Sequence, residues 1–262
     1  MKKILYVFLI SCFSFTIFSC AKKDGSSDTS TSFWPKQIGT SSNDYGTGVT
    51  VEFSDNIHVS GQSNGGLDGN INSLNDGIFL VKYNSSGTKL WTKQLGIFDN
   101  ESGISMTVDS SDNIYVTGYT TEGYDGNSNS GNYDIFLVKY NSSGNKLWTK
   151  QLGNSDTDIG MGVIVDSSDN IYVTGIASGG LDRNTSSGGE DIVLMKYNSS
   201  GIKQWRKQLG SSSSDFAWDV TVDSSDNIYV TGFINGSLDG QFNQGSNYDI
   251  FLVKYNSDGV KQ

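Results

Sequence analysis

Cysteine and histidine are nearly absent from this sequence. Its two cysteines both lie within the first 20 residues, so the rest of the chain has neither a free thiol nor a disulfide. Cysteine catalysis, thiol redox chemistry and cysteine-ligated zinc are therefore excluded there. The single histidine, His58, stands where corresponding stretches place Tyr115, Tyr172 and Tyr229, which indicates a substituted strand residue. One histidine also argues against a Ser-His-Asp triad or a multi-histidine metal site.

Positive charge and proline are scarce as well. Lysine and arginine number 18 against 28 acidic residues, and the formal net charge is −10. No basic patch is visible, which disfavours nucleic acid or an anionic lipid surface as an electrostatic partner. Glycine is abundant, aromatic residues make up 12% of the chain, and Pro35 is the one proline. Such a balance is typical of many short strands joined by polar turns, whereas low-complexity disorder would lack the aromatic residues.

The amino terminus has the features of an export signal. Lys2 and Lys3 precede an apolar run from 4 to 18 that is too short to cross a bilayer as a helix. The run leads to Cys20, and the segment resembles a bacterial lipoprotein signal. The resemblance implies a signal peptide over 1–19, acyl chains such as palmitate on Cys20, and a lipid anchor in the cell envelope. Ala21 favours the outer membrane as the destination, and an ordinary secretory peptide is the alternative.

The rest of the chain is one unit written four times. Trp34, Trp91, Trp148 and Trp205 stand 57 residues apart, and each opens the motif W-x-K-Q-I/L-G. The units are 34–90, 91–147, 148–204 and 205–262. Residues 20–32 lack apolar periodicity and are predicted to form a flexible tether to a repeat domain over 33–262.

Each unit carries four strand signals. In the second unit they are Lys89–Leu95, Gly103–Val108, Asn113–Tyr119 and Asp134–Tyr140, which are rich in β-branched and aromatic residues and bounded by Gly, Asn, Asp and Ser. No stretch of helical length has a 3.6-residue apolar period. We therefore predict an all-β domain of four-stranded antiparallel sheets, in which the fully apolar strand from 135 to 138 lies between neighbouring sheets.

The motifs D-x-x-D-N-I-Y-V-T-G and D-I-F-L-V-K-Y-N recur from residue 34 to 262, and the unit resembles the bacterial β-propeller repeat SBBP. The resemblance implies a β-propeller, but no settled activity. Four repeats predict four blades, and Trp34–Gly39 would complete the last of them by pairing beside Asp249–Tyr255. A chain cut from a longer array, or two chains sharing eight blades, are the alternatives to this monomeric ring.

Loop lengths predict which end of the domain binds a ligand. The short turns at 109–112 and 141–144 fall on one face, and the longer connections at 97–102 and 120–133 fall on the other. The long connections differ among the repeats while the strands hardly change. Recognition is therefore expected on the long-loop face.

Spaced oxygen-bearing side chains in the long loops predict a calcium site, because a hard cation prefers carboxylate and amide oxygens. Ordinary turn chemistry is the alternative, since the glycine expected at the sixth loop position is Ser73 in the first repeat. The candidate ligands are Asp68, Asn70, Asn72 and Asp76; Asp125, Asn127, Asn129 and Asp134; Asp182, Asn184 and Asp191; and Asp239, Asn243 and Asp249.

A second acidic position recurs on the same face, together with aromatic residues that could stack on sugars or contact a protein. The candidate ligand-binding residues are Asp44, Glu101, Asp158, Asp215, Tyr45, Phe98 and Tyr124. We expect a non-enzymatic envelope scaffold that binds a protein or glycan. The alternatives are a glycan-cleaving enzyme that uses a carboxylate pair such as Asp44 and Asp68, and a purely structural protein.

Overall fold

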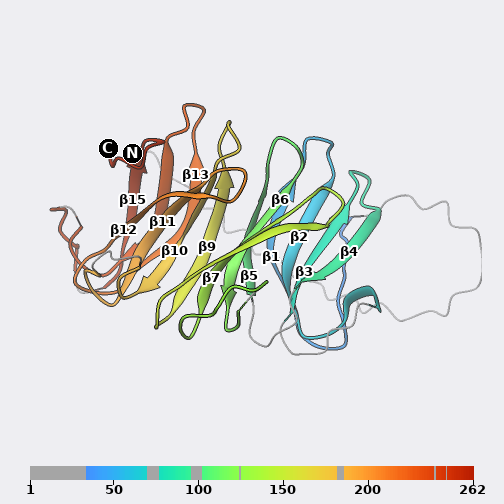
Figure 1. The fold of residues 1–262 in the computed structure, drawn as a ribbon, viewed down its shortest axis with the longest axis horizontal. Coiled ribbons are helices and arrows are strands. Elements are labelled where there is room, and N and C mark those ends of the chain that lie inside the picture. Colours follow the sequence, from blue (N-terminus) through green and yellow to red (C-terminus); the bar gives the residue numbers. More distant parts are fainter. Residues whose placement is uncertain are drawn as a thin grey trace, which may run out of the picture. The chain divides into compact units, whose positions relative to one another are not determined.

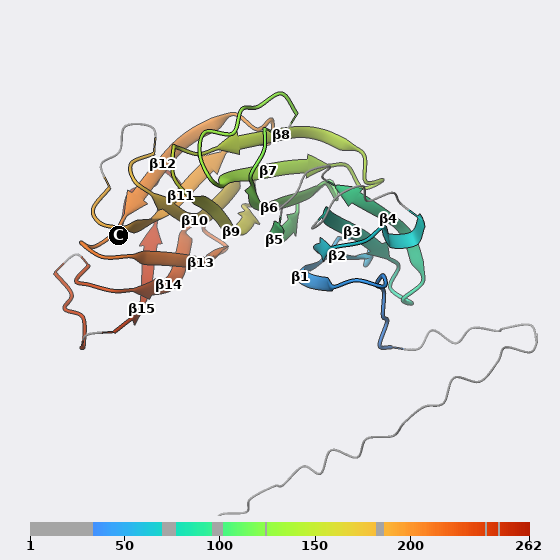
Figure 2. The same cartoon turned by 90° about the horizontal axis from the view of Figure 1, so that it is seen from below.

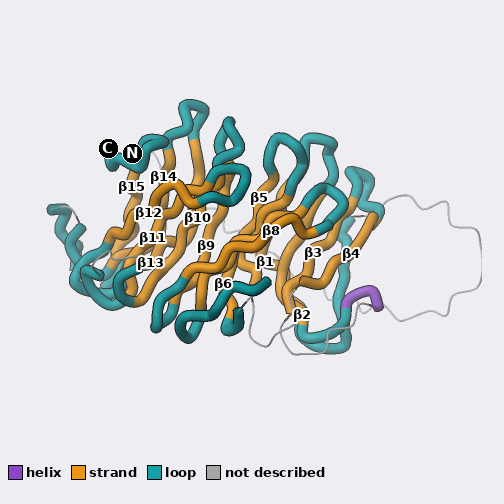
Figure 3. Tube along the Cα trace, viewed as in Figure 1, coloured by secondary structure: helices purple, strands orange, loops and turns teal. Residues whose placement is uncertain are grey.

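The computed structural model describes residues 34–69, 77–95, 102–123, 125–181, 186–238, 240–245 and 247–262. Regular structure in these ranges is almost entirely β-strand, which confirms the predicted all-β class (Figure 1 and Figure 3). The helical exception is η1, a 3-10 turn at Leu67–Gly69. No helix in these ranges has the length and apolar character that crossing a membrane requires.

The strands form four antiparallel sheets, numbered here in chain order. Sheet 1 contains β1 (Asp44–Val51), β2 (Ile57–Ser63), β3 (Gly77–Tyr83) and β4 (Lys89–Leu95); sheet 2 contains β5 (Ser102–Val108), β6 (Ile114–Thr120), β7 (Asp134–Tyr140) and β8 (Lys146–Leu152); sheet 3 contains β9 (Asp158–Val165), β10 (Ile171–Ser178), β11 (Glu190–Tyr197) and β12 (Lys203–Leu209); sheet 4 contains β13 (Asp215–Val222), β14 (Ile228–Ile234) and β15 (Asp249–Tyr255). Within each sheet the strands pair in sequence order. The four strands predicted in the second repeat are confirmed, with ends that differ by one residue.

Tight turns join the first strand to the second and the third to the fourth. In sheet 2 the Asp109 amide donates to the Asn113 carbonyl, and Asp112 takes a φ of 59°. The second turn closes through Gly144, whose φ is 73°. Asp and Gly tolerate this left-handed backbone better than most residues, which explains why these two types occupy the turns.

Successive sheets follow one another in chain order (Figure 2). In sheets 1, 2 and 3, apolar residues of the third strand pack on the first strand of the next sheet. Ile135 and Leu137 of β7 share a buried cluster with Val163 of β9. Strands β1, β5, β9 and β13 together line a cavity of about 420 Å³. First strands around a common space and sheets packed face to face are the arrangement of a β-propeller.

Sheet 4 differs from the other three because it has three strands. The predicted pairing of Trp34–Gly39 with β15 is not formed. Trp34 instead lies against Gly87 of sheet 1, 3.2 Å from the position that a Cβ on this glycine would take. Trp91 has the same relation to Gly144, at 3.1 Å, so the segment contacts sheet 1 as β4 contacts sheet 2. Closure by the N-terminal strand stays a prediction.

Candidate functional site

Two of the predicted calcium-loop aspartates are paired with lysine in the structure. Asp68 and Asp125 take left-handed backbone angles, with φ of 53° and 52°, and accept contacts of 2.5 Å from Lys89 and Lys146. The Lys89 contact lowers the pKa of Asp68. Burial would raise the pKa of Asp125, but its bonds to Lys146 and Thr149 outweigh this, and the pKa is lowered. Both carboxylates tie a long loop to the outer strand of its own sheet.

The closing aspartates of the predicted calcium loops lie at or next to the first residue of the third strands, where they cap the loop backbone. Asp134 accepts from the Ser130 amide at 3.0 Å, Asp191 from Ser187 at 2.8 Å, and Asp249 from Gln244 at 2.6 Å. Asn129 and Asn243 also bond to loop backbone, and Asn127 has an interaction of its own. In the part of the chain that the structure describes, no three acidic, histidine or cysteine side chains converge on one point.

Calcium binding by these loops therefore stays a prediction, and the described aspartates fit turn capping better than metal coordination. The candidate ligands that lie outside the described residues are Asn70, Asn72, Asp76, Asp182, Asn184 and Asp239.

The structure brings together acids that the sequence analysis assigned to two separate sets. Asp158, at the start of β9, is fully buried near Asp134 of the preceding sheet, and neither Oδ1 atom has a hydrogen-bond partner. Burial, and then the charges of Asp134 and Asp156, raise the pKa of Asp158 to about 7. The next junction repeats the arrangement. Asp191 Oδ1 and Asp215 Oδ2 lie 2.1 Å and 3.2 Å from the position that a Cβ on Gly210 would take.

These junction acids are sealed between sheets, so they cannot reach a ligand in solution. The members of the second acidic set that the structure describes are Asp44, Asp158 and Asp215. Asp44 accepts from Ser63 Oγ at 2.5 Å and from the Thr40 amide at 2.6 Å. Burial would raise its pKa, but these bonds outweigh it and the pKa is lowered. Tyr45 is exposed, whereas Glu101, Phe98 and Tyr124 lie outside the described residues.

His58 is a strand residue with a matched partner. It is fully buried in β2, and its Nε2 lies 2.8 Å from Glu52 Oε2. In the other sheets the equivalent tyrosine donates through its hydroxyl to an aspartate, as Tyr115 does to Asp109 at 2.9 Å. The shorter histidine is compensated by the longer glutamate, a paired change that the sequence analysis missed.

The short-turn face links each sheet to the next, a role that the sequence analysis also missed. The Phe53 amide donates to Asp112 at 3.0 Å, Ser110 Oγ to Asp169 at 2.8 Å, and Ser167 Oγ to Asp226 at 2.9 Å. The recurring D-S-S-D motif was the available signal, because its second and fourth residues supply the donor and acceptor. This face is used for packing.

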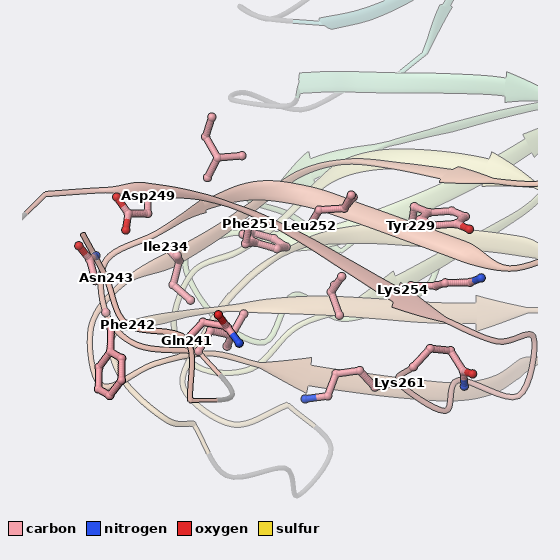
Figure 4. Close-up of a pocket in the computed structure, with 15 residues that line it drawn as sticks. Tyr229, Ile234, Gln241, Phe242, Asn243, Asp249, Phe251, Leu252, Lys254 and Lys261 are labelled. Atoms are coloured by element: carbon pink, nitrogen blue, oxygen red, sulfur yellow. The ribbon is translucent and has the colours of Figure 1, made fainter. Parts of the chain in front are cut away.

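An open groove of about 780 Å³ runs beside β15 (Figure 4). It is lined by Tyr229, Leu252 and Lys254, among others. In sheets 2 and 3 the residue equivalent to Tyr229 faces a tryptophan of the fourth strand, with 6.0 Å between the ring centroids of Tyr172 and Trp205. The groove therefore occupies the place that a fourth strand fills elsewhere.

Aromatic residues cover the same end of sheet 4. Phe216, Phe233 and Ile250 lie opposite one another across β13, β14 and β15, so their side chains share one face. Phe233 also contacts Tyr248, with ring centroids 4.8 Å apart. Phe242, another aromatic residue of the long loops, is 80% exposed at the groove. Sheet 4 thus presents an exposed apolar surface that includes Ile250, Leu252 and Phe242.

Known proteins share parts of this sequence. An uncharacterized WD repeat-containing protein of Acanthamoeba polyphaga mimivirus is 28% identical over 64% of this chain and 16% of its own length. The regulatory protein FlaEY of Caulobacter vibrioides is 26% identical over 56% of this chain and 17% of its own length. The chain thus spans less than a fifth of these relatives.

Solved structures also resemble parts of the chain. A gluconolactonase of Xanthomonas campestris has 11% identity, a TM-score of 0.43, and coverage of 82% of this chain and 60% of its own. A xylan beta-1,4-xylosidase of Bacillus halodurans has 13% identity, a TM-score of 0.44, and coverage of 82% and 42%.

A family model supplies the identification. The model described as beta-propeller repeat, SBBP, matches residues 34–68, 90–125, 147–182 and 204–239, which together are more than half of the chain. Each match begins at or next to a recurring tryptophan and ends in the long loop at the Asp68 position. This chain belongs to the SBBP beta-propeller repeat family.

Proposed function

We propose that this protein is a non-enzymatic binding scaffold of the bacterial cell envelope, anchored by lipid on Cys20, which binds a protein or glycan through its long-loop face. The observation that carries the proposal is that the two faces differ: one makes contacts between sheets, and the other carries the variable loops. Turns on one face are committed to contacts between sheets, as in the Ser110 and Asp169 pair. The loops on the other face differ among the repeats, and such loops on a rigid scaffold are suited to recognition.

The state of the carboxylates supports a role without catalysis. A general acid needs a pKa raised toward the working pH. The pKa values of Asp44 and Asp68, the pair considered for glycan cleavage, are both lowered by hydrogen bonds. Among the carboxyl groups that the structure describes, Asp158 has a strongly raised pKa, and it is buried between sheets where a sugar cannot reach it.

Binding to a glycan array and to purified envelope proteins would test the proposal. We expect the full chain to bind a defined ligand, and we expect Tyr45→Ala, which removes an exposed aromatic ring from β1, to weaken binding about tenfold. Leu90→Ala is the matched control, because Leu90 is similarly exposed on another strand. Turnover of a glycan substrate, or equal losses in both variants, would contradict the proposal.

The anchor is tested separately. Labelled palmitate should be incorporated into the wild-type chain in its host and not into the Cys20→Ser variant. Retention of this variant in the membrane fraction would show that another element holds the protein there.

A further inference from the structure

Sheets 1 and 4 each expose an apolar surface that the repeat buries elsewhere. Leu252 of β15 is 70% exposed, whereas its equivalents in the other three sheets are at most 2% exposed. Val49 of β1 is 68% exposed, whereas its equivalent Val163 is 4% exposed. At the other junctions these two positions pack together, as Leu137 does with Val163. The surfaces of β15 and β1 are therefore two halves of one kind of interface.

We propose that sheet 4 of this chain binds sheet 1 of a second copy, head to tail, through the same contacts that join consecutive sheets within the chain. This inference is independent of the ligand bound by the long loops. Burial of the two apolar surfaces supplies the driving force.

The short-turn face offers a matched hydrogen-bond pair for this interface. Within the chain, Ser110 donates to Asp169 and Ser167 to Asp226. The equivalent donor on sheet 4 is Ser224, and the equivalent acceptor on sheet 1 is Asp55. Both are exposed, and no such bond joins them within the described residues. Asp55 already has the left-handed backbone of Asp226, with φ of 61° against 58°.

Lysine supplies a further repeated contact. Lys82 Nζ donates to the Ser142 carbonyl of the next sheet at 3.2 Å, and Lys196 Nζ to the Ser257 carbonyl at 3.0 Å. By the same spacing, Lys254 would donate to the Ser85 carbonyl of the second copy. Lys254 lines the open groove beside Tyr229 (Figure 4).

The groove beside β15 fits the strand that the second copy would bring. Trp34–Gly39 has the sequence of the fourth strands and lies on Gly87 as Trp91 lies on Gly144. Docked in the common register, Trp34 would reach Tyr229 and Ile38 would lie opposite Ile250, as Leu152 lies opposite Ile135. The segment needs no rearrangement, because it already sits where the outer strand of a preceding sheet would be.

A second copy fits these observations better than closure of one chain on itself. Three junctions in this chain already make the repeated contacts, and with all three formed the surfaces of sheets 1 and 4 remain uncovered. One further junction of the same kind, formed between sheet 4 and sheet 1 of a second copy, would cover both surfaces at once. Such a head-to-tail contact closes into a ring or continues as a filament.

Disulfide trapping tests this interface in the full chain carrying Cys12→Ser and Cys20→Ser, which removes both native cysteines. One preparation carries Ser224→Cys and another carries Asp55→Cys, and the two are mixed under mild oxidation. We expect a cross-linked species of twice the chain mass. The control is Ser167→Cys with Asp226→Cys in one chain, which should form an internal disulfide at an established junction.

Light scattering on the same background provides a second measurement. We expect assemblies of two or more copies, reduced to single chains by Ile250→Glu with Leu252→Glu. Ile202→Glu is the control, because Ile202 is exposed outside this interface. A wild-type monomer by light scattering would overturn the proposal. It would also be overturned if Ser224→Cys with Asp55→Cys in one chain formed only an internal bond, which would show that the chain closes on itself.

Discussion

At the scale of single residues, the repeats differ by changes that compensate one another. His58 and Glu52 replace a tyrosine and an aspartate that the other three sheets keep. Glu52 also accepts from Lys82 at 2.7 Å. Burial would raise the pKa of Glu52, but the bonds from His58 and Lys82 lower it to about 2. His58, Glu52 and Lys82 therefore form one buried network around the Glu52 carboxylate.

A double-mutant cycle should reveal this compensation. His58→Tyr alone crowds Glu52, and Glu52→Asp alone withdraws the carboxylate from its partners, so each should destabilise the chain by about 1 to 3 kcal/mol. The double variant recreates the pair seen at Tyr115 and Asp109, and it should recover most of that loss. Urea unfolding measures all four proteins. Additive losses in the double variant would contradict the coupling.

The buried carboxyl of Asp158 predicts a pH dependence of stability. Its pKa is about 7 in the fold and near 3.8 when unfolded, so the folded state binds the extra proton between these values. Stability should therefore fall as pH rises from about 4 to about 7, by at most about 4 kcal/mol from this group. Asp158→Asn should remove most of this slope, whereas Asp258→Asn on the surface should keep it. Unfolding in urea at pH 5 and pH 8 makes the comparison, and equal slopes in all three proteins would exclude the effect.

At the scale of elements, the strands themselves could be predicted because their apolar pattern is local. Residues 134–140 are predicted as a strand with a fully apolar centre from 135 to 138, and β7 is buried along its whole length. The contacts between sheets could not be predicted in this way. Asp134 and Asp158 are 24 residues apart and meet only because β9 packs beside β7. Their pairing depends on how the sheets stack, which the spacing of residues within one repeat does not reveal.

Two glycines with positive φ should show how much close packing against the preceding sheet limits substitution in the hairpin turn. Gly144→Ala places a methyl group on a residue with φ of 73° and 3.1 Å from both Trp91 and Lys93 of the preceding sheet. Gly126→Ala meets the same backbone strain, with φ of 82°, but no atom lies within 4 Å of the new methyl. We expect a loss of about 1 to 2 kcal/mol for Gly126→Ala and a larger loss for Gly144→Ala. Thermal unfolding compares the two variants, and equal losses would show that Trp91 and Lys93 move aside without a cost in stability.

At the scale of the whole molecule, the predicted four-repeat propeller architecture is confirmed, whereas the way in which its ends are covered is not settled by the repeat pattern. The pattern predicts that Trp34–Gly39 is a fourth strand. It does not tell whether this strand pairs with β15 of its own chain or with β15 of another copy. The same motif serves an edge in its own chain or in a neighbour. The answer depends on the angle between successive sheets, which side-chain packing sets.

Calcium should change the stability of the whole chain little. Asp68 and Asp125 already accept from lysine in the described loops, and a cation would have to displace these bonds. We therefore expect the Tm to differ by less than about 1 °C between excess calcium and a chelator. A site that binds only the folded state would add about 2.7 kcal/mol at a hundredfold excess over its Kd, enough for a rise of several degrees. A rise of that size would instead restore the loops as metal sites.

The donor and acceptor turns of the short-turn face make every boundary between sheets chemically interchangeable. Ser167 would find in any following repeat the aspartate that Asp226 provides here. A duplicated block of 57 codons could therefore enter the gene at any of these boundaries, and its product would find its contacts already supplied on both sides. Repeat number can consequently grow or shrink during evolution without the invention of a new interface.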